Sequence, residues 1–461
     1  MNKKYDRRNF VKLSTGVTVG DEDLSGNSSP KYGSALTQTG NKPIRLGFVG
    51  IGGRGSYHLN CALGIEGVEV PALCELKPVR LYEAKRWVEA AGLPTPKLYD
   101  RGPMDFKRMC EEEDLDAIIC CTPWEFHTQV CVAAMKNNKH AVSEVPICIT
   151  LEEAWELVET YESTGKWATI GLEGTGDSTL LNMVYKGVFG DIVHTEGGYV
   201  HDLRMVKFTP AEEPWRLQHS LNRNGNLYPD HPMARMMPLL DINRGDRFDY
   251  IQSMSSNAVM LNNYAALNYG KDTQYAKAKV SLGDYNASLI RTASGKMITL
   301  NHDTSTPHPR EDFRLQGTKG VYMSNALPTV GTQPEAPAVR QPGGRRGGRI
   351  YLDGVSPKPH TWEPADKYFK EYALPVATIP PRRGGAIEGH GGGGTLTPMN
   401  WHRLVIALRE NKMPDWDVYD SVTSGAIVPL SCASVANKCQ AVDFPDFTKG
   451  KWKTRPRITL G

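Results

Sequence analysis

The sequence predicts an α/β protein, with a doubly wound parallel sheet near the N-terminus and then an α+β domain with a large, open, mostly antiparallel sheet. Two observations lead to this prediction. Between residues 43 and 170, short apolar runs alternate with segments of helical spacing, which is typical of a parallel sheet and its crossover helices. Beyond residue 174, β-rich runs such as "KVSLGDYNASLIRTASGKMITLNHDT" follow one another with loops between them, which favours an open sheet.

The predicted domains follow from the same patterns. Residues 1–42 form a tail, 43–170 the first domain and 171–461 the second. Glycine- and arginine-rich sequence predicts a loop-rich insertion at about 327–396. The segment "MNWHRLVIALRENK", at 399–412, has the spacing of a helix, which we expect to pack back on the first domain.

The composition excludes several classes of function. A formal net charge of +3 is too small to indicate nucleic acid or a membrane surface as a partner. No apolar run approaches the roughly 20 residues of a membrane span. Several of the 9 cysteines lie within apolar runs, which is typical of buried thiols rather than of a disulfide framework. No CxxC pair is present, and we predict no metal site.

The N-terminus allows two interpretations. "DRRNFVKLS" resembles a twin-arginine export signal, which would make the protein periplasmic or otherwise exported. The apolar stretch that should follow is poor, because "TGVTVGDEDLSGNSSP" has few apolar residues and then three acids. The alternative is a disordered polar tail on a cytoplasmic protein.

The stretch "RLGFVGIGGRGSYH" joins a buried apolar strand, spaced glycines and the start of a helix. In this context G-x-G-x-x-G is the fingerprint of a Rossmann dinucleotide-binding fold. Gly50 would form the tight turn, Gly52 would let the backbone approach a pyrophosphate, and Gly55 would let the helix pack close to the strand. The phosphates would bind at the helix N-terminus, where we also assign Gly53 and Arg54 to the cofactor.

An acidic residue follows at the distance that this fold requires. "VEVPALCE" ends in Glu75, about 20 positions after the last glycine, where a carboxylate bonds the adenosine ribose. Glu75 favours NAD and repels the additional phosphate of NADP. Arg80 is close enough in the sequence to reach such a phosphate, and would act in the opposite direction.

Two further apolar strands, in "LDAIICCTPWEFH" and "NKHAVSEVP", end in residues that can reach the same ligand. In a doubly wound sheet, ligands collect at the carboxyl ends of the strands. The residues assigned to the cofactor there are Thr122, Pro123, Trp124, His127, Glu144 and Val145.

With these motifs, the chain resembles the glucose–fructose oxidoreductase and inositol dehydrogenase superfamily. In that superfamily, TP-x-x-x-H and E-K-P strand ends flank the nicotinamide, and here they read Thr122, Pro123 and His127, and "EVP". The lysine of E-K-P helps to move the hydroxyl proton in the plain dehydrogenases. Val145 stands in its place and cannot carry a proton, so an acid or base must come from elsewhere.

The second half is similar to one branch, glycoside hydrolase family 109, which comprises NAD-dependent glycosidases known for α-N-acetylgalactosaminidase activity. The motifs are "GGYVHDLR", "NRNGNLYPDH", "INRGDR", "GHGG" and "PDFTKGKW", and the resemblance covers residues 43 to 461 with gaps. It implies a hexopyranoside substrate such as an N-acetylgalactosaminide. It also implies transient oxidation at C3, elimination across C1–C2, water addition and re-reduction, with NAD tightly bound and recycled.

The same resemblance implies the remaining site residues. His231 lies in "LYPDHP", where we expect Pro229 and Pro232 to forbid a regular helix and to hold the histidine stiffly for proton transfer. A surface or structural role remains the alternative for each histidine. The catalytic residues assigned are His231, Tyr228 and His201, and the substrate-binding residues are Tyr199, Arg204, Tyr228, Arg310 and His390.

Some residues depart from the family pattern. A tyrosine that is a candidate for removing the C2 proton is absent from "LEGTGDSTLLNMV", after Glu173. "PMARMMP" replaces a Gly-Pro stretch after His231, and "TPHPRED", around Arg310, stands where the family has a substrate tyrosine. These changes bear on elimination and on sugar specificity rather than on hydride transfer.

Two other classes of function therefore remain open. One is an NAD-dependent sugar or glycoside 3-dehydrogenase without elimination, and the other is a non-catalytic sugar or dinucleotide sensor. In each case we expect a small carbohydrate as the partner, and a homo-oligomer could form through the open sheet.

Overall fold

A computed structural model gives the fold of most of the chain. The described residues are 42–172, 178–209, 215–307, 313–324, 348–374 and 396–458. The twin-arginine-like segment and three residues singled out above, Glu173, Arg310 and His390, lie outside these ranges.

The first sheet is parallel and has the strand order β3-β2-β1-β4-β5-β6. Its order reverses between β1 and β4, which makes it doubly wound, as predicted. The strands are β1 (Ile44–Val49), β2 (Val68–Cys74), β3 (Lys97–Tyr99), β4 (Ala117–Cys120), β5 (His140–Ser143) and β6 (Ala168–Thr169). The helices are α2 (Gly53–Leu63), α3 (Pro78–Ala90), α4 (Asp105–Glu112), η1 (Trp124–Phe126), α5 (His127–Lys136) and α6 (Leu151–Thr164). The central strands β4 and β5 are buried throughout, as expected for strands covered on both faces.

The second sheet has the order β14-β13-β12-β11-β7-β10-β9-β8-β15, and its described pairs are antiparallel except for β7 with β10. This confirms the predicted open, mostly antiparallel sheet. The strands are β7 (Ile192–Val200), β8 (Phe248–Ser255), β9 (Asn286–Thr292), β10 (Met297–Asp303), β11 (Arg314–Gly317), β12 (Gly320–Met323), β13 (Arg349–Leu352), β14 (Glu363–Pro364) and β15 (Val442–Asp443). Burial alternates along β9, so one face is covered and the other is exposed.

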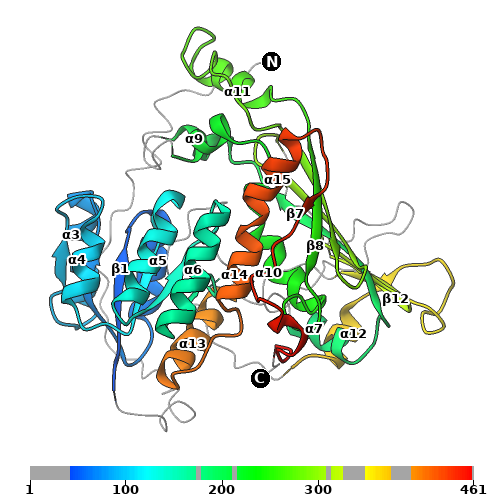
Figure 1. Ribbon diagram of the computed structural model, residues 1–461, viewed down its shortest axis with the longest axis horizontal. Coiled ribbons are helices and arrows are strands. Elements are labelled where there is room, and N and C mark those ends of the chain that lie inside the picture. Colours follow the sequence, from blue (N-terminus) through cyan, green and yellow to red (C-terminus); the bar gives the residue numbers. More distant parts are fainter. Residues whose placement is uncertain are drawn as a thin grey trace, which may run out of the picture. The chain divides into compact units, whose positions relative to one another are not determined.

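The rest of the chain contributes further helices, some of which pack on this sheet. They are α7 (Ser178–Tyr185), α8 (Arg204–Phe208), α9 (Trp215–Asn222), α10 (Asp230–Leu239), α11 (Met260–Tyr269), α12 (Asp366–Glu371), α13 (Leu396–Arg409), α14 (Val418–Gly425), α15 (Ile427–Ala436) and η3 (Lys451–Lys453). Helix α10 packs on β7 and α15 packs on β8, whereas α14 contacts α6 on one side and α10 on the other (Figure 1). No helix in the described part of the chain is long and apolar enough to cross a membrane.

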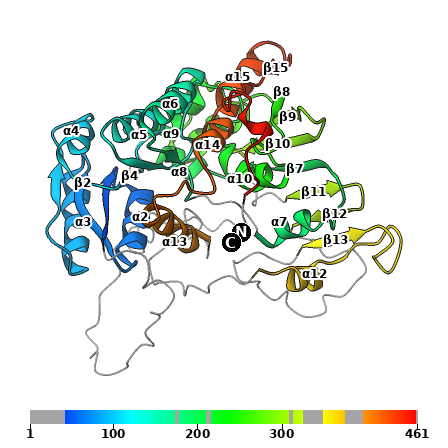
Figure 2. The ribbon, with the colours of Figure 1, turned by 60° about the horizontal axis from the view of Figure 1, so that its bottom comes forward.

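Helix α13 lies against α2 and β1 of the first sheet (Figure 2). The indole Nε1 of Trp401 donates a hydrogen bond to Nδ1 of His58, at 3.1 Å. Arg409 donates to the backbone carbonyl of Glu66. The C-terminal part of the chain therefore supports the helix that follows the glycine loop.

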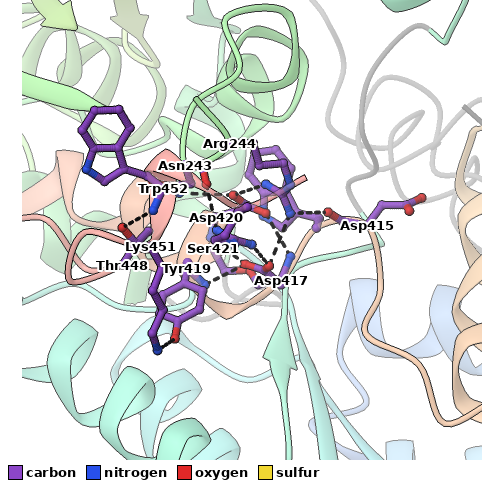
Figure 3. Close-up of polar contacts among 12 residues, drawn as sticks. Asn243, Arg244, Asp415, Asp417, Tyr419, Asp420, Ser421, Thr448, Lys451 and Trp452 are labelled. Atoms are coloured by element: carbon purple, nitrogen blue, oxygen red, sulfur yellow. Dashed lines mark hydrogen bonds and ion pairs between the residues drawn. The ribbon is translucent and has the colours of Figure 1, made fainter. Parts of the chain in front are cut away.

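A buried polar network joins two of the motifs quoted above, "INRGDR" and "PDFTKGKW" (Figure 3). Arg244 lies 2.7 Å from Asp420 of α14, and Asn243 donates to the same carboxylate at 3.1 Å. The backbone N–H of Gly245 donates to the carbonyl of Trp452 at 2.8 Å. These contacts give both motifs a structural role, which is to anchor α14.

Candidate active site

The glycine loop has the geometry of a phosphate cradle. Gly50 has φ +81°, and a Cβ on Gly55 would lie 2.0 Å from the carbonyl oxygen of Gly50, so neither position accepts another side chain. A Cβ on Gly52 would meet only the guanidinium of Arg80, at 3.2 Å, among the described residues. Gly52 is also the N-cap of α2 and carries no side-chain cap. The open space and the positive helix end therefore fit the pyrophosphate of a dinucleotide.

Glu75 is held beside this loop. One carboxylate oxygen accepts a hydrogen bond from the N–H of Ile51 at 2.6 Å, and the other accepts from the N–H of Lys77 at 2.8 Å. Each oxygen retains acceptor capacity, since a carboxylate has about four lone-pair sites. Glu75 is thus fixed at the end of β2, where the fold binds the ribose.

Glu144, directly after β5, pairs with two side chains of α2, the helix that follows the glycine loop. Its Oε1 lies 2.9 Å from Nε of Arg54 and 2.6 Å from Nε2 of His58. Because the Trp401 indole can only donate, Nδ1 of His58 must accept, and the network assigns the ring proton to Nε2. Burial raises the pKa of Glu144, but Arg54 and His58 outweigh it and hold that pKa well below its usual range. Glu144 is thus an ionised carboxylate that fixes Arg54 and α2.

His127 braces the two strand-end loops. The ring is buried, with Nδ1 2.7 Å from the carbonyl of Pro146 and Nε2 2.8 Å from the carbonyl of Thr122. Burial lowers the pKa of His127, although the two carbonyls oppose this effect. Both ring nitrogens therefore face the backbone, and these contacts make His127 a support for Thr122 and Pro146.

Five of the residues assigned from the sequence come together in an aromatic cluster. The ring of Tyr199, on β7, stacks on His231 and on Tyr228, with centroids 4.7 Å apart in each pair. Tyr228 meets Trp124 edge to face at 4.9 Å. His201 Nδ1 lies 3.2 Å from the hydroxyl of Tyr199. Trp124 follows β4, so the cluster adjoins the carboxyl ends of the first sheet.

The expectation that two prolines forbid a helix at His231 is wrong. Helix α10 begins at Asp230, with Pro229 as its N-cap residue and Pro232 in its first turn. Proline is tolerated there because the first N–H groups of a helix have no intrahelical acceptor. His231 is therefore held by a helix end rather than by a loop.

Two known families match the chain, each over a different part of it. Residues 44–172 match the sequence profile of the oxidoreductase family with an NAD-binding Rossmann fold. Residues 177–454 match that of the glycosyl hydrolase 109 C-terminal domain. The chain belongs to glycosyl hydrolase family 109. Both resemblances inferred from the sequence are thus confirmed, and the protein is an enzyme, a glycoside hydrolase or sugar oxidoreductase.

Individual relatives cover almost the whole chain. A family 109 protein of Solibacter usitatus (strain Ellin6076) is 35% identical, over 99% of this chain and 100% of the relative. An α-N-acetylgalactosaminidase of Tannerella forsythia is 34% identical, over 97% of each. Among solved structures, an oxidoreductase domain protein from Kribbella flavida has a TM-score of 0.64 at 16% identity, and covers 88% of this chain and 100% of its own. Levoglucosan dehydrogenase, in complex with NADH and levoglucosan, has a TM-score of 0.61 at 16% identity with the same coverage. These two structures share the fold.

Within this family 109 chain, Arg204 lies at the start of α8 and forms a bidentate pair with Asp202, at 2.9 and 2.7 Å. Its guanidinium also lies over the ring of Tyr264. These contacts direct Arg204 toward Asp202, and its contact with a sugar stays a prediction. Within the described residues, no group of three or more His, Cys, Asp or Glu side chains could hold a metal ion.

Three residues of the site have no counterpart in the sequence-based assignments. His219 stacks on Trp124 at 4.4 Å, and His302 stacks on Tyr228 at 6.0 Å. Lys207 is buried on α8, and its Nζ bonds to Thr304, two residues after His302. The sequence places His302 in a β-rich run, which predicts that it lies on a strand. It does not predict that this strand pairs His302 with Tyr199, because strand register depends on residues far apart in the sequence.

Proposed function

We propose that this family 109 enzyme is an NAD-dependent glycosidase that acts on a hexopyranoside such as an N-acetylgalactosaminide. The observation that carries the proposal is the contact of Trp124 with Tyr228, at 4.9 Å. It joins the carboxyl ends of the dinucleotide-type sheet to a cluster with two imidazoles and two phenols. The activity named for the Tannerella forsythia relative supports the choice of sugar.

The chain's own residues suit the cofactor. The N-terminus of α2 and the space in front of Gly52 would hold the pyrophosphate, and Glu75 would hold the ribose. Thr122, Pro123 and Trp124 border the nicotinamide end. NAD held there would supply the hydride chemistry at C3 of the sugar, and it would have to stay tightly bound because the same hydride is needed again within the turnover.

Val145 has no titratable group, so we assign proton transfer to residues of the aromatic cluster. We assign His231 to the proton of the C3 hydroxyl, with Tyr228 orienting it. The imidazolium then donates that proton to the departing glycosidic oxygen, so the group is neutral again after elimination. The hydrogen-bonded pair of Tyr199 and His201 is our candidate for taking the C2 proton, in place of the absent family tyrosine.

Burial supports this assignment. Tyr199, Tyr228 and Trp124 are buried, whereas His231 and His201 are partly exposed. The cluster thus offers apolar ring faces to a pyranose and ring-edge nitrogens to its hydroxyl groups. A neutral sugar is the ligand class that this combination fits best.

A sugar 3-dehydrogenase is the second candidate, favoured by the missing tyrosine in "LEGTGDSTLLNMV". The two are separated by purifying the protein without added cofactor and supplying aryl glycosides of several sugars. We expect aglycone release without net NADH formation. NADH that accumulates in proportion to sugar, without aglycone, would contradict the glycosidase and support the dehydrogenase.

A further inference from the structure

A buried lysine lies behind the aromatic cluster. Lys207 is 1% exposed, and its Nζ donates to the hydroxyl of Thr304 at 2.8 Å, with Ser305 Oγ at 3.5 Å. Across the ranges that the structure describes, no carboxylate oxygen forms an ion pair with this ammonium. A buried cation whose partner is a hydroxyl rather than a carboxylate is costly to hold, so its position calls for an explanation.

Three carboxylates influence Lys207 from neighbouring elements, but each is committed to other donors. Asp202 pairs with Arg204, whereas Asp284 and Asp303 accept hydrogen bonds from backbone N–H groups. Burial lowers the pKa of Lys207 to about 7, and the charges of Asp303, Asp284 and Asp202 oppose that effect. The amine therefore changes its charge close to neutral pH.

His302 connects this lysine to the cluster. It lies on β10 directly opposite Tyr199 of β7, and its ring stacks on Tyr228 with an interplanar angle of 9°. The side chain is 0% exposed, and neither ring nitrogen has a hydrogen-bond partner in the described part of the chain. Burial, together with the charge of Lys207, lowers the pKa of His302 to about 3, so the ring is neutral. The neutral ring of His302 thus stacks on Tyr228 and is also within the electrostatic influence of Lys207, whose ammonium bonds to Thr304 two residues further along the chain.

We propose that Lys207 is a positioning residue whose buried charge, acting through His302, favours the basic forms of Tyr228 and His231. The inference rests on the proposed function, because it assigns these two residues to proton transfer. Val145 stands where the superfamily has a lysine at the strand end. Lys207 would give the site a lysine charge at a different position. In a low-dielectric surrounding, a nearby cation lowers the pKa of acids and bases alike.

The test compares Lys207→Met with Lys207→Arg, which keeps a permanent charge. Lys139→Met is the matched control, because Lys139 is also buried but donates to the backbone carbonyl of Asn137, in the turn between α5 and β5. The readout is the pH dependence of kcat/KM for an aryl glycoside. We expect the acidic limb of Lys207→Met to move upward by on the order of one pH unit, and those of Lys207→Arg and Lys139→Met to stay in place.

A purely structural role would leave the pH profile where it is, even if turnover fell, and that result would overturn the proposal. If Lys207→Met fails to fold, Thr304→Val removes the hydroxyl partner while retaining the lysine. It should move the same limb upward by a smaller amount, and an unmoved limb would overturn the proposal as well.

Failure of the proposed function is recognised separately, as absence of aglycone release by the wild type. The inference then depends on a spectroscopic titration that needs no turnover. The ionisation of Tyr228 is assigned as the tyrosine step that disappears in Tyr228→Phe. This step should occur at lower pH in Lys207→Arg than in Lys207→Met. Equal midpoints in the two variants would overturn the role of Lys207.

Discussion

The imidazole of His231 stacks on the phenol of Tyr199 with ring centroids 4.7 Å apart and an interplanar angle of 19°. The two residues come from different elements, the first turn of α10 and the end of β7. Stacking fixes the plane of the imidazole and leaves its nitrogens at the ring edge, where a sugar hydroxyl can meet them. This arrangement underlies the assignment of His231 to proton transfer.

His231→Ala should lower turnover by about 10²–10⁴-fold, which is the usual value of general acid–base assistance. NAD affinity should stay unchanged, because the histidine lies outside the glycine loop. Poor leaving groups should suffer more than activated aryl groups, since in the proposed mechanism the same imidazolium protonates the glycosidic oxygen. Steady-state kinetics on an aryl glycoside series measures both effects. The control is His194→Ala, which changes a histidine of β7 that bonds to Thr299 of β10. Turnover of His231→Ala equal to that control would refute the assignment.

Two substitutions in the glycine loop should fail in different ways. Gly52→Val should abolish NAD binding with little effect on the melting temperature, because the new side chain meets only the movable guanidinium of Arg80. Gly55→Ala should instead destabilise the fold, because its Cβ would lie 2.0 Å from a backbone oxygen. Thermal unfolding and NAD titration of both variants separate the two effects. Normal NAD affinity in Gly52→Val would show that the cradle is misassigned.

Arg244→Met should destabilise the protein by about 3–5 kcal/mol, because it leaves the buried Asp420 and Asp417 without this partner. Lys277→Met breaks an exposed pair with Asp272 and should cost at most about 1 kcal/mol. Urea unfolding gives both values. Equal costs in the two variants would contradict the structural role given to "INRGDR".

The stability of the wild type relative to Lys207→Met should depend on pH. The pKa of Lys207 is lowered by burial to about 7 in the folded chain, from an ordinary value of 10.5. Between these values the unfolded chain binds a proton that the folded chain lacks, so the wild type gains stability as the pH rises. Below about pH 7 the full cost of the buried charge is present, and Lys207→Met should have its largest advantage there. Urea midpoints at neutral and alkaline pH test this, and a difference that is constant with pH would contradict it.

Local spacing was sufficient to predict the geometry of the glycine loop and the strand-end carboxylate, whereas the cofactor contacts assigned to them stay a prediction. Gly50, Gly52, Gly55 and Glu75 act through a turn, a helix end and a strand end that lie close together in the sequence. The substrate half was predicted through family resemblance, and the cluster of Tyr199 and its neighbours forms where the elements meet.

What the sequence did not reveal depends on long-range pairing. His302 joins the cluster because β10 aligns it with Tyr199 of β7, and no local pattern sets that register. Lys207 is part of a short helix of mixed polar and apolar residues, and its burial is a tertiary effect. At His231, proline was judged by its effect in a helix interior, whereas the helix begins there.

The central claim is that a sugar is oxidised at C3 so that its C2 proton can be removed before the aglycone leaves. Turnover of an aryl N-acetylgalactosaminide in D₂O, with mass and NMR analysis of the released sugar, tests it most directly. The account predicts one deuterium at C2 in the product, with aglycone release matched to sugar release and no net NADH. Aglycone released from a sugar that retains its original C2 hydrogen would contradict the account.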